Sequence, residues 1–214
     1  ELELLGARRV FVVSTRSLAA SAELQGVTAV LGDRLCGVFC DVPAHAPREC
    51  VVAGARAIRS SAPDLLVALG GGSVIDATKV MALCVRFGYE RVEELDPHAN
   101  RRPPDAGRTP ADASSWPRIV AIPTTLSGAE FASSGGATDS RTAMKQSFVN
   151  PMQMPVSVIL DPAMTLSAPL PLILATGIKA VDHAVERVTT ANATPFSVAV
   201  SLLALGLLAR SLPA

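Results

Sequence analysis

The sequence predicts an α/β fold built on a parallel sheet, and two observations support this prediction. Short apolar runs, typical of strands buried on both faces, alternate along the chain with segments of helical periodicity. Such alternation implies parallel strands joined by right-handed crossovers. Loops rich in glycine or hydroxyl side chains also follow two of these runs, where open α/β sheets bind their ligands. The 214 residues, 49% of them hydrophobic, are enough for a packed core.

The first two strands are predicted from short, mainly apolar runs. Residues 9–14 (R-V-F-V-V-S) form the first strand, and residues 15–24 can begin a helix. Residues 38–42 (V-F-C-D-V) form the second strand, which leads through P-A-H-A-P into a helix over about residues 48–60.

The chain is organised around residues 64–79, D-L-L-V-A-L-G-G-G-S-V-I-D-A-T-K. The run at residues 65–69 predicts a buried strand, and the three glycines at 70–72 allow a tight turn and close approach of a ligand to the peptide N–H groups. Ser73 is a natural N-cap for the helix that follows. A strand, a glycine turn and a helix N-terminus together form an anion site. The alternative is a turn that uses glycine for geometry alone, since neither G-x-G-x-x-G nor G-x-x-x-x-G-K-[ST] is present.

A second ligand loop is predicted further along. Residues 96–117 carry proline, charge and small polar side chains without an apolar period, which predicts a surface excursion. The chain returns to the core in a strand at residues 118–122, and P-T-T-L-S-G-A-E-F follows directly. Glu130 stands three residues after Ser127, as a capping box requires. The alternative is a polar connection with a good cap, but two such loops at the ends of two buried strands favour a ligand site.

Composition excludes several classes of partner. Lys plus Arg and Asp plus Glu both number 19, so the zero net charge provides no electrostatic basis for binding nucleic acid or an anionic membrane. The cysteines at 36, 40, 50 and 84 form no C-x-x-C pair, which predicts reduced thiols rather than a metal cluster. Glu1 and Glu3 are unlike the basic start of a signal peptide, and residues 196–209 are too few to span a bilayer. We expect a cytoplasmic protein.

Several motifs in chain order carry a resemblance to a known family. They are G-G-G-S-V-I-D-A-T-K, I-P-T-T-L-S-G-A-E-F, G-G-A-T-D, a lone Lys145, V-I-L-D-P-A-M-T and T-G-I-K-A-V-D-H-A-V-E. Together they resemble the iron-containing alcohol dehydrogenase superfamily, and T-T-L-S-G-A-E and D-H-A-V-E are most similar to its maleylacetate reductase branch. The resemblance implies an α/β dinucleotide-binding domain, here residues 1–168, followed by the beginning of an all-helical domain at residues 169–214. The active site would lie in the cleft between them.

The resemblance implies a nicotinamide cofactor, NADH or NADPH, bound across both loops. The glycine loop would hold the pyrophosphate, and the second loop would line the nicotinamide and its ribose. Lys145 falls where the family has a lysine near the cofactor, and its charge can favour phosphates or ribose. Thr15 falls where NAD-preferring members often have Asp; with Arg16 beside it and no carboxylate, NADPH is at least as suitable as NADH. The implied cofactor-binding residues are Thr15, Gly70, Gly71, Gly72, Ser73, Thr124, Thr125, Ser127 and Lys145.

The resemblance also identifies the candidate catalytic residues. Metal-dependent members carry an Asp and a His four residues apart on one helix, but here the equivalents are Lys179 and His183, and an ammonium cannot ligate a metal. Asp182 lies about 100° round the helix from His183 and is not expected to replace the ligand. We therefore expect no bound iron or zinc. Lys179 is the candidate cation for an oxyanion or a substrate carboxylate and His183 the candidate proton donor; the alternative is a structural His183 paired with Glu186.

The predicted function is an NAD(P)H-dependent reductase that transfers a hydride to a small carbonyl or oxo-acid, or to the adjacent C=C, as maleylacetate reductases do. Two alternatives stay open: a metal-dependent alcohol dehydrogenase with ligands outside these residues, and a non-catalytic relative that binds the cofactor. The helix at residues 196–209 lacks a polar face and needs burial on most sides. We expect a longer protein, or a homo-oligomer such as a dimer, to cover it.

Overall fold

The structure is a computed structural model that describes residues 1–101 and 116–212. Within these residues a five-stranded parallel sheet forms the centre, which confirms the predicted α/β class. The strand order is β2-β1-β3-β4-β7. The strands are β1 (Val10–Val13), β2 (Leu35–Phe39), β3 (Leu65–Gly70), β4 (Arg118–Pro123) and β7 (Ser157–Val158). Because the order changes direction between β1 and β3, these two strands flank the switch point of the sheet.

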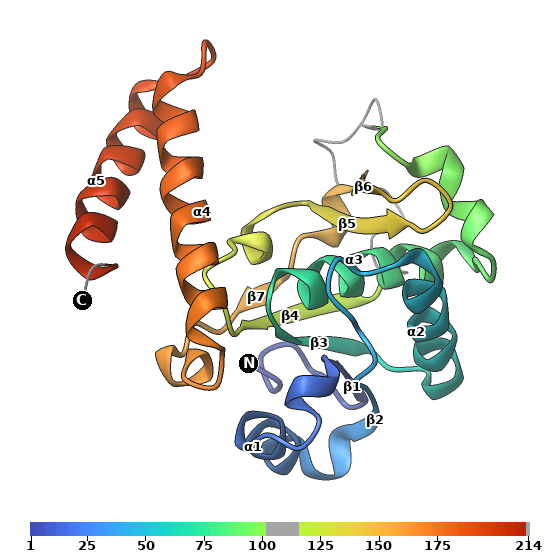
Figure 1. Cartoon of the computed structure of the whole chain (residues 1–214). Coiled ribbons are helices and arrows are strands. Elements are labelled where there is room, and N and C mark those ends of the chain that lie inside the picture. Colours follow the sequence, from blue (N-terminus) through green and yellow to red (C-terminus); the bar gives the residue numbers. More distant parts are fainter. Residues whose placement is uncertain (102–115, 213–214) are drawn as a thin grey trace.

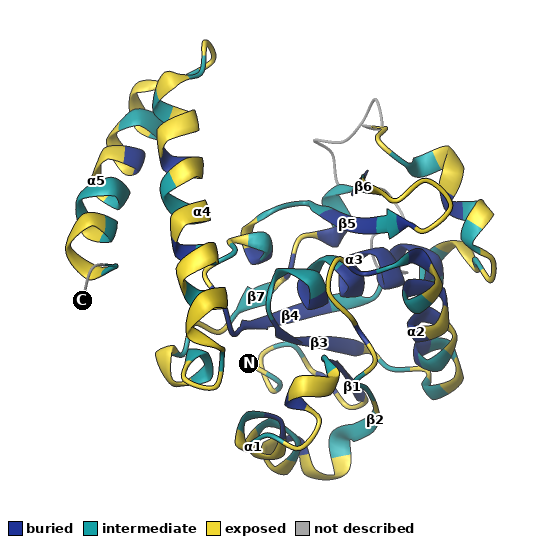
Figure 2. Cartoon of the chain, in the orientation of Figure 1, coloured by how far each residue is buried: buried dark blue, intermediate teal, exposed yellow. Residues whose placement is uncertain are grey.

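Helices cover both faces of the sheet (Figure 1). They are α1 (Ala22–Leu31), α2 (Arg48–Ser61) and α3 (Gly72–Phe87). Phe11 and Val13 of β1 belong to the buried cluster on the α2 and α3 side, whereas Val10 and Val12 belong to the cluster on the α1 side. The central strands read as continuous apolar runs because both of their faces are buried (Figure 2).

A separate antiparallel hairpin packs on α3. It consists of β5 (Ser134–Asp139) and β6 (Met144–Val149). Gly135 allows the close approach, because a Cβ there would lie 2.8 Å from the Asp76 carbonyl oxygen. The buried Arg48 ties the hairpin to α2 by donating a hydrogen bond to Gln146 Oε1 (2.5 Å).

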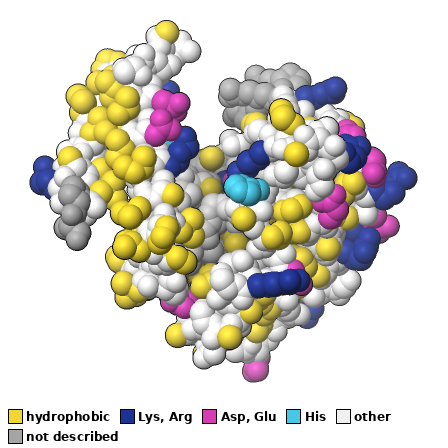
Figure 3. Space-filling view, viewed as in Figure 1, with side chains coloured by type: hydrophobic (Ala, Val, Ile, Leu, Met, Phe, Trp, Pro, Cys, Tyr) yellow, Lys and Arg dark blue, Asp and Glu magenta, His cyan; other side chains and the backbone are white. Residues whose placement is uncertain are grey.

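Two long helices follow the α/β part. α4 (Leu170–Thr189) and α5 (Pro195–Ser211) lie side by side, and α4 reaches the carboxyl ends of β4 and β7 (Figure 1). Many of their apolar side chains are exposed, among them Ile178 (64%) and Leu203 (64%), and Figure 3 shows this apolar surface. Among the described residues, no helix is both long enough and apolar enough to cross a membrane.

The predicted bounds of two elements are wrong. The second strand covers Leu35–Phe39 rather than residues 38–42, because its pairing with β1 ends at Val13 and Phe39. After β1 the chain forms a short 3-10 turn, and α1 begins only at Ala22, where the Ser21 side chain accepts a hydrogen bond from a backbone N–H.

The predicted surface excursion at residues 96–117 is also ordered where it begins. Residues 92–98 form a 3-10 helix, and Asp96 accepts hydrogen bonds from Arg48 (2.5 Å) and Arg141 (2.8 Å). Two arginines from α2 and the β5–β6 turn therefore hold this segment on the molecule. Residues 102–115 of the excursion lie outside the described residues.

Candidate functional site

The two predicted ligand loops meet at the carboxyl edge of the sheet. The first follows β3 and the second follows β4, which is its neighbour in the sheet. At the same edge, Ser14 Oγ at the end of β1 donates a hydrogen bond to the Leu69 carbonyl of β3 (2.8 Å). The fold therefore brings the segment after β1 and both loops together at the switch point, where open α/β sheets bind their ligands.

The glycine loop, residues 70–73, leads directly from β3 into α3. Gly71 is the N-cap and α3 begins at Gly72, so the prediction that Ser73 caps the helix is wrong. Ser73 lies within the first turn, and its Oγ accepts a hydrogen bond from the His45 N–H (3.1 Å). The N-terminus of α3 still opens on the sheet edge, where its unpaired N–H groups and positive dipole favour an anion.

The missing side chains of the glycine loop let the two loops touch. A Cβ on Gly71 would lie 3.1 Å from Thr125 Oγ1, and a Cβ on Gly72 would lie 2.9 Å from Ser127 Oγ. Gly70 adopts φ +156°, and a Cβ there would also collide with the first turn of α3. Glycine at these positions is therefore needed for the close fit between the loops.

The second loop, residues 123–131, is anchored to the first loop and to α4. The Thr124 N–H donates to the Gly70 carbonyl (3.1 Å), and the Leu126 N–H donates to Thr176 Oγ1 of α4 (3.2 Å). Thr124 itself is buried. These bonds fix the loop between the sheet edge and the helical part of the chain.

The capping box predicted within this loop does not form. Gly128 adopts a left-handed conformation (φ +69°) and precedes a 3-10 helix, Ala129–Phe131, too short for the predicted cap. Ser127 Oγ accepts one long hydrogen bond, 3.4 Å, from the backbone N–H two residues on. Glu130 is instead buried, with 4% of its surface exposed.

Lys79 of α3 is a residue of this site that sequence reasoning missed. It is fully buried, and its Nζ donates to the carbonyls of Ala129 (2.6 Å), Ala132 (2.5 Å) and Ser134 (3.2 Å). Burial lowers the pKa of Lys79 to about 8, against two nearby carboxylates that raise it. The available signal was a charged side chain directly before the apolar stretch at residues 80–85. Lys79 fastens α3 to the end of the second loop.

Lys145 of β6 lies at the rim of the site. Its Nζ pairs with Asp76 Oδ2 of α3 (2.9 Å), and about half of its side chain is exposed. A Cβ on Gly136 would collide with both of these side chains. A hollow of about 370 Å³ opens beside the pair. The structure thus brings Lys145 to the helix of the glycine loop, with its charge balanced by Asp76.

Thr15 follows β1 at the sheet edge, and its neighbour Arg16 pairs with Asp41 (Nε to Oδ1, 2.5 Å). Asp41 follows β2, and since the carboxyl ends of neighbouring parallel strands meet, a carboxylate does lie at this edge after all. Sequence reasoning missed this carboxylate because Arg16 and Asp41 follow different strands and lie 25 residues apart. A carboxylate suits a ribose hydroxyl, whereas an arginine suits a 2′-phosphate.

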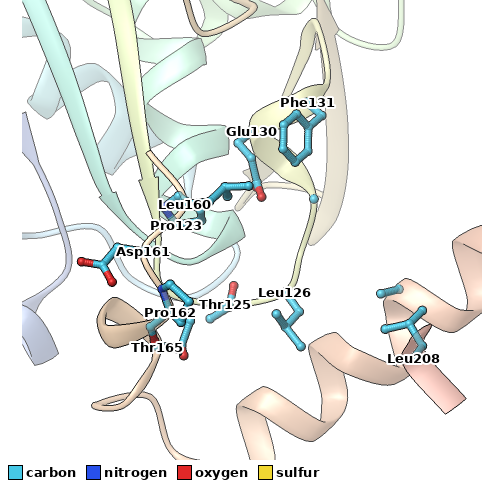
Figure 4. A pocket seen from close by; sticks show the side chains of 12 residues that line it. Pro123, Thr125, Leu126, Glu130, Phe131, Leu160, Asp161, Pro162, Thr165 and Leu208 are labelled. Carbon is cyan, nitrogen blue, oxygen red and sulfur yellow. Dashed lines mark hydrogen bonds between the residues drawn. The ribbon is translucent and has the colours of Figure 1, made fainter. Parts of the chain in front are cut away.

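A pocket of about 420 Å³ opens beyond the second loop, between the ends of β4 and β7 and the helices α4 and α5 (Figure 4). Thr125 and Glu130 line it, and Figure 4 shows their polar ends turned toward the same space. A pocket of this size can hold a small ligand. The rest of the wall is mainly apolar and includes Pro123, Leu126, Phe131, Leu160, Pro162 and Leu208.

α4 carries both predicted catalytic residues, one turn apart, but neither lines this pocket. Lys179 Nζ pairs with Asp182 Oδ2 (2.5 Å), and this hydrogen bond raises the pKa of Lys179. His183 lines a separate hollow further along α4, together with Glu186. The structure therefore places both residues on the helix that borders the pocket, through Ala180, but not on the pocket wall.

The side chains present on α4 do not fit a metal. Within residues 1–101 and 116–212, no group of three His, Cys, Asp or Glu is arranged to hold a metal ion. Lys179 cannot be a ligand, and its ammonium forms an ion pair with the carboxylate of Asp182. The four cysteines are free, and burial raises the pKa of the Cys84 thiol to about 12, which disfavours the thiolate that a metal would need.

A parallel sheet with two ligand loops in contact at its switch point defines the α/β nucleotide-binding class. The model of the family described as iron-containing alcohol dehydrogenase matches residues 1–162. The chain belongs to the iron-containing alcohol dehydrogenase family.

Relatives of the chain are named dehydrogenases and reductases. It is 33% identical to Dehydrogenase ALT3 of Alternaria alternata over 86% of this chain and 47% of the relative. It is 30% identical to the maleylacetate reductase of Delftia acidovorans over 100% of this chain and 51% of the relative. The chain therefore spans about half the length of the curated relatives it matches.

Solved structures agree on the fold. The maleylacetate reductase of Agrobacterium tumefaciens gives a TM-score of 0.77 at 25% identity, covering 99% of this chain and 51% of that one. The sulfoacetaldehyde reductase of Bifidobacterium kashiwanohense, solved in complex with NAD⁺, gives 0.86 at 24% identity, covering 99% and 54%. The second likeness concerns the fold alone.

Proposed function

We propose that the protein is an NAD(P)H-dependent reductase that acts on a small carbonyl or oxo-acid, in the manner of maleylacetate reductases. The observation that carries this proposal is the contact of the two ligand loops at the switch point, with a largely apolar pocket directly beyond them. A nicotinamide cofactor bound there supplies the hydride. Relatives named dehydrogenases and reductases support the same class of reaction.

The residues at the sheet edge fit a dinucleotide. Residues 70–73 leave room that side chains would fill, and the N-terminus of α3 favours a pyrophosphate. Thr124, Thr125 and Ser127 of the second loop would line the nicotinamide and its ribose. On the opposite side of the glycine loop, Thr15 would meet the adenosine. Lys145, at the rim of the site, would neutralise charge on the phosphates of the cofactor.

Lys179 and His183 are the residues to which we assign charge stabilisation and proton transfer. Lys179 is cationic at neutral pH, since pairing with Asp182 raises its pKa, and it can attract a substrate carboxylate or an oxyanion. His183 carries an imidazole, a side chain that can act as a general acid. A substrate that extends from the pocket along α4 would meet both side chains.

We also infer that iron and zinc take no part, because Lys179 replaces a ligand by an ammonium and engages Asp182. The family description favours one competing function: a metal-dependent dehydrogenase whose remaining ligands lie outside these residues. A cofactor-binding relative without turnover is the third candidate. Metal content separates the first two, and turnover separates both from the third.

The test is calorimetric titration of the purified protein with NADH and NADPH, with metal content measured on the same sample. Micromolar binding of either dinucleotide without stoichiometric metal is the expected result, and oxo-acids are then screened for oxidation of the bound cofactor. Binding of neither dinucleotide would overturn the proposal, and stoichiometric iron or zinc would favour the metal-dependent function.

A further inference from the structure

The second ligand loop is joined to α4 by a single side chain, Thr176. Its Oγ1 accepts a hydrogen bond from the Leu126 N–H of the loop (3.2 Å) and donates one within its own helix, to the Leu172 carbonyl (2.9 Å). The donated bond restricts the rotamer of the hydroxyl, so that its remaining lone pairs face the loop. Among the described residues, no second hydrogen bond connects α4 with the α/β part.

The packing of α4 against the loop is closest at the same point. Gly177, the next residue, is buried, whereas most of the helix is not. A Cβ on Gly177 would lie 2.6 Å from the Leu212 side chain at the end of α5 and 3.6 Å from the Leu126 side chain. Figure 4 shows Leu126 between the second loop and α4. The helix is therefore held against the loop at residues 176 and 177.

The regular geometry of α4 extends this contact to the two residues assigned to charge stabilisation and proton transfer. Lys179 and His183 lie three and seven residues after Thr176, on the same side of the helix and about 4.5 Å and about 10 Å along its axis. In the loop, the donating N–H belongs to the rigid peptide group that joins Thr125 to Leu126. One bond thus relates a residue proposed to line the nicotinamide to both residues on α4.

We propose that Thr176 is a positioning residue that couples the second ligand loop to α4. It sets how far Lys179 and His183 stand from a cofactor held by the loops, and it contacts neither the cofactor nor the substrate. The inference rests on the proposed function and adds to it a route by which cofactor binding orders α4. Loss of the bond is expected to slow turnover, because small misplacements of reacting groups are costly, and to leave cofactor binding intact.

The test uses three substitutions of Thr176 in the full protein. Thr176→Val keeps the shape of the side chain and removes its hydroxyl, Thr176→Ala removes the hydroxyl in a residue of higher helix propensity, and Thr176→Ser keeps it. The matched control is Thr189→Val. Thr189 Oγ1 also donates to a carbonyl of α4, that of Val185 (3.1 Å), but among the described residues it accepts no hydrogen bond from either loop.

Each protein is measured in three ways. Calorimetry gives the affinity for NADH, and mass spectrometry gives the rate of amide hydrogen exchange in residues 123–131 and 178–189, with and without NADH. Oxidation of NADH with maleylacetate as the oxo-acid gives kcat and KM.

In the wild type, NADH is expected to slow exchange about threefold or more in both segments. In Thr176→Val and Thr176→Ala, NADH should slow exchange in the loop alone. Their kcat should fall about tenfold, while NADH affinity and KM stay within about threefold of the wild type. Thr176→Ser and Thr189→Val should behave as the wild type does in every measurement.

The inference would be overturned if NADH left exchange of residues 178–189 unchanged in the wild type, or slowed it equally in Thr176→Val. It would also be overturned by an unchanged kcat in Thr176→Val, by an equal loss in Thr189→Val, or by a parallel loss of NADH affinity, which would make Thr176 a support for binding. All of these results leave the proposed function standing.

Two further outcomes are covered by the same measurements. If the wild type does not reduce maleylacetate, the exchange rates decide, and if Thr176→Val does not fold, Thr176→Ala decides. A wild type that binds no NADH would overturn the inference together with the proposed function.

Discussion

Single residues decide how closely the two ligand loops approach each other. The backbone of the glycine loop packs directly against the side chains of Thr125 and Ser127. A Cβ added to the loop would press against these side chains or collide with them. Because the loops touch, the proposed cofactor would meet them as one surface. Substitutions here are therefore expected to act on binding more than on folding.

The substitution Gly72→Ala is expected to weaken NADH binding about tenfold, because its Cβ would lie 2.9 Å from Ser127 Oγ and push the loops apart. Calorimetry on folded protein measures the effect. The matched control is Gly26→Ala in α1, where a Cβ meets nothing within 4 Å and should stabilise the helix by about 0.5–1 kcal/mol. Unchanged binding in Gly72→Ala would show that the loops can separate freely.

Asp41→Ala is expected to shift the preference from NADH toward NADPH by about tenfold. The change removes a carboxylate that repels a 2′-phosphate and releases Arg16 to bind it. Because both side chains are largely exposed, the free energy of unfolding should change little. Affinity for both cofactors is measured in this variant and in Asp33→Ala, an exposed control. A constant NADH to NADPH ratio contradicts the assignment.

Lys179→Ala and His183→Ala are each expected to lower turnover about 100-fold or more and to leave NADH affinity within about threefold. Both residues lie on α4, and neither belongs to the two ligand loops. Steady-state kinetics and calorimetry are measured on the same preparations. Full activity in both variants would remove them from the mechanism.

Among the elements, α3 joins the parts of the site. Its N-terminus carries the glycine loop, Asp76 holds Lys145, and Lys79 reaches three carbonyls between residues 129 and 134. An ammonium with three carbonyl acceptors can stay buried, although burial still lowers its pKa. A single helix thus sets the relative position of the glycine loop and the end of the second loop.

Lys79→Met should lower the free energy of unfolding by about 1–3 kcal/mol at neutral pH, since it leaves buried carbonyls without a donor. It should also change the pH dependence. The folded pKa, about 8, lies below the ordinary 10.5, so between these values the unfolded chain holds more protons and unfolding free energy rises with pH. In Lys79→Met this rise of the unfolding free energy with pH is absent.

The comparison needs the difference between the two proteins, because burial raises the pKa of Cys50 to about 11 and of Cys84 to about 12, and these thiols act in the opposite direction. Denaturation at several pH values measures the difference. Arg56→Met, an exposed change on α2, is the control. A wild-type minus Lys79→Met difference that does not depend on pH contradicts the buried, shifted lysine.

Elements with a continuous apolar pattern were predictable from the sequence. Elements that are fixed by contacts with residues distant in the sequence were not. The strands at residues 65–69 and 118–122 and the glycine loop agree with the structure. The β5–β6 hairpin went unpredicted because its glycines reflect packing on α3 rather than a turn. Within the site, the contacts of Asp41 and Lys79 join residues 25 to 55 positions apart, which no local pattern reveals.

On the scale of the whole molecule, the apolar core lies in the α/β part. Both buried clusters, with the partly buried residues packed on them, fall between residues 2 and 164. α4 and α5 leave large apolar side chains exposed. This contrast is consistent with the domain boundary after residue 168, which was predicted from the resemblance. The boundary, the predicted homo-oligomer (a dimer) and the cytoplasmic location all stay predictions.

A chain ending at Ala168 is therefore expected to unfold in one cooperative transition and to bind less apolar dye than the protein with both helices. Its core needs nothing from α4 or α5, whose exposed apolar side chains it lacks. Thermal unfolding and dye fluorescence measure the two properties. A non-cooperative transition in the shortened chain would place the boundary elsewhere.

The switch point also affects how the protein unfolds. The segments after β1, β3 and β4 are far apart in the sequence, and Ser14 Oγ to the Leu69 carbonyl links only the first two directly by a side chain. A ligand bound across all three segments acts as a reversible cross-link between parts of the chain about 50 residues apart. The protein can unfold only after this ligand dissociates from them. Occupancy would then lengthen the lifetime of the folded protein in the presence of proteases.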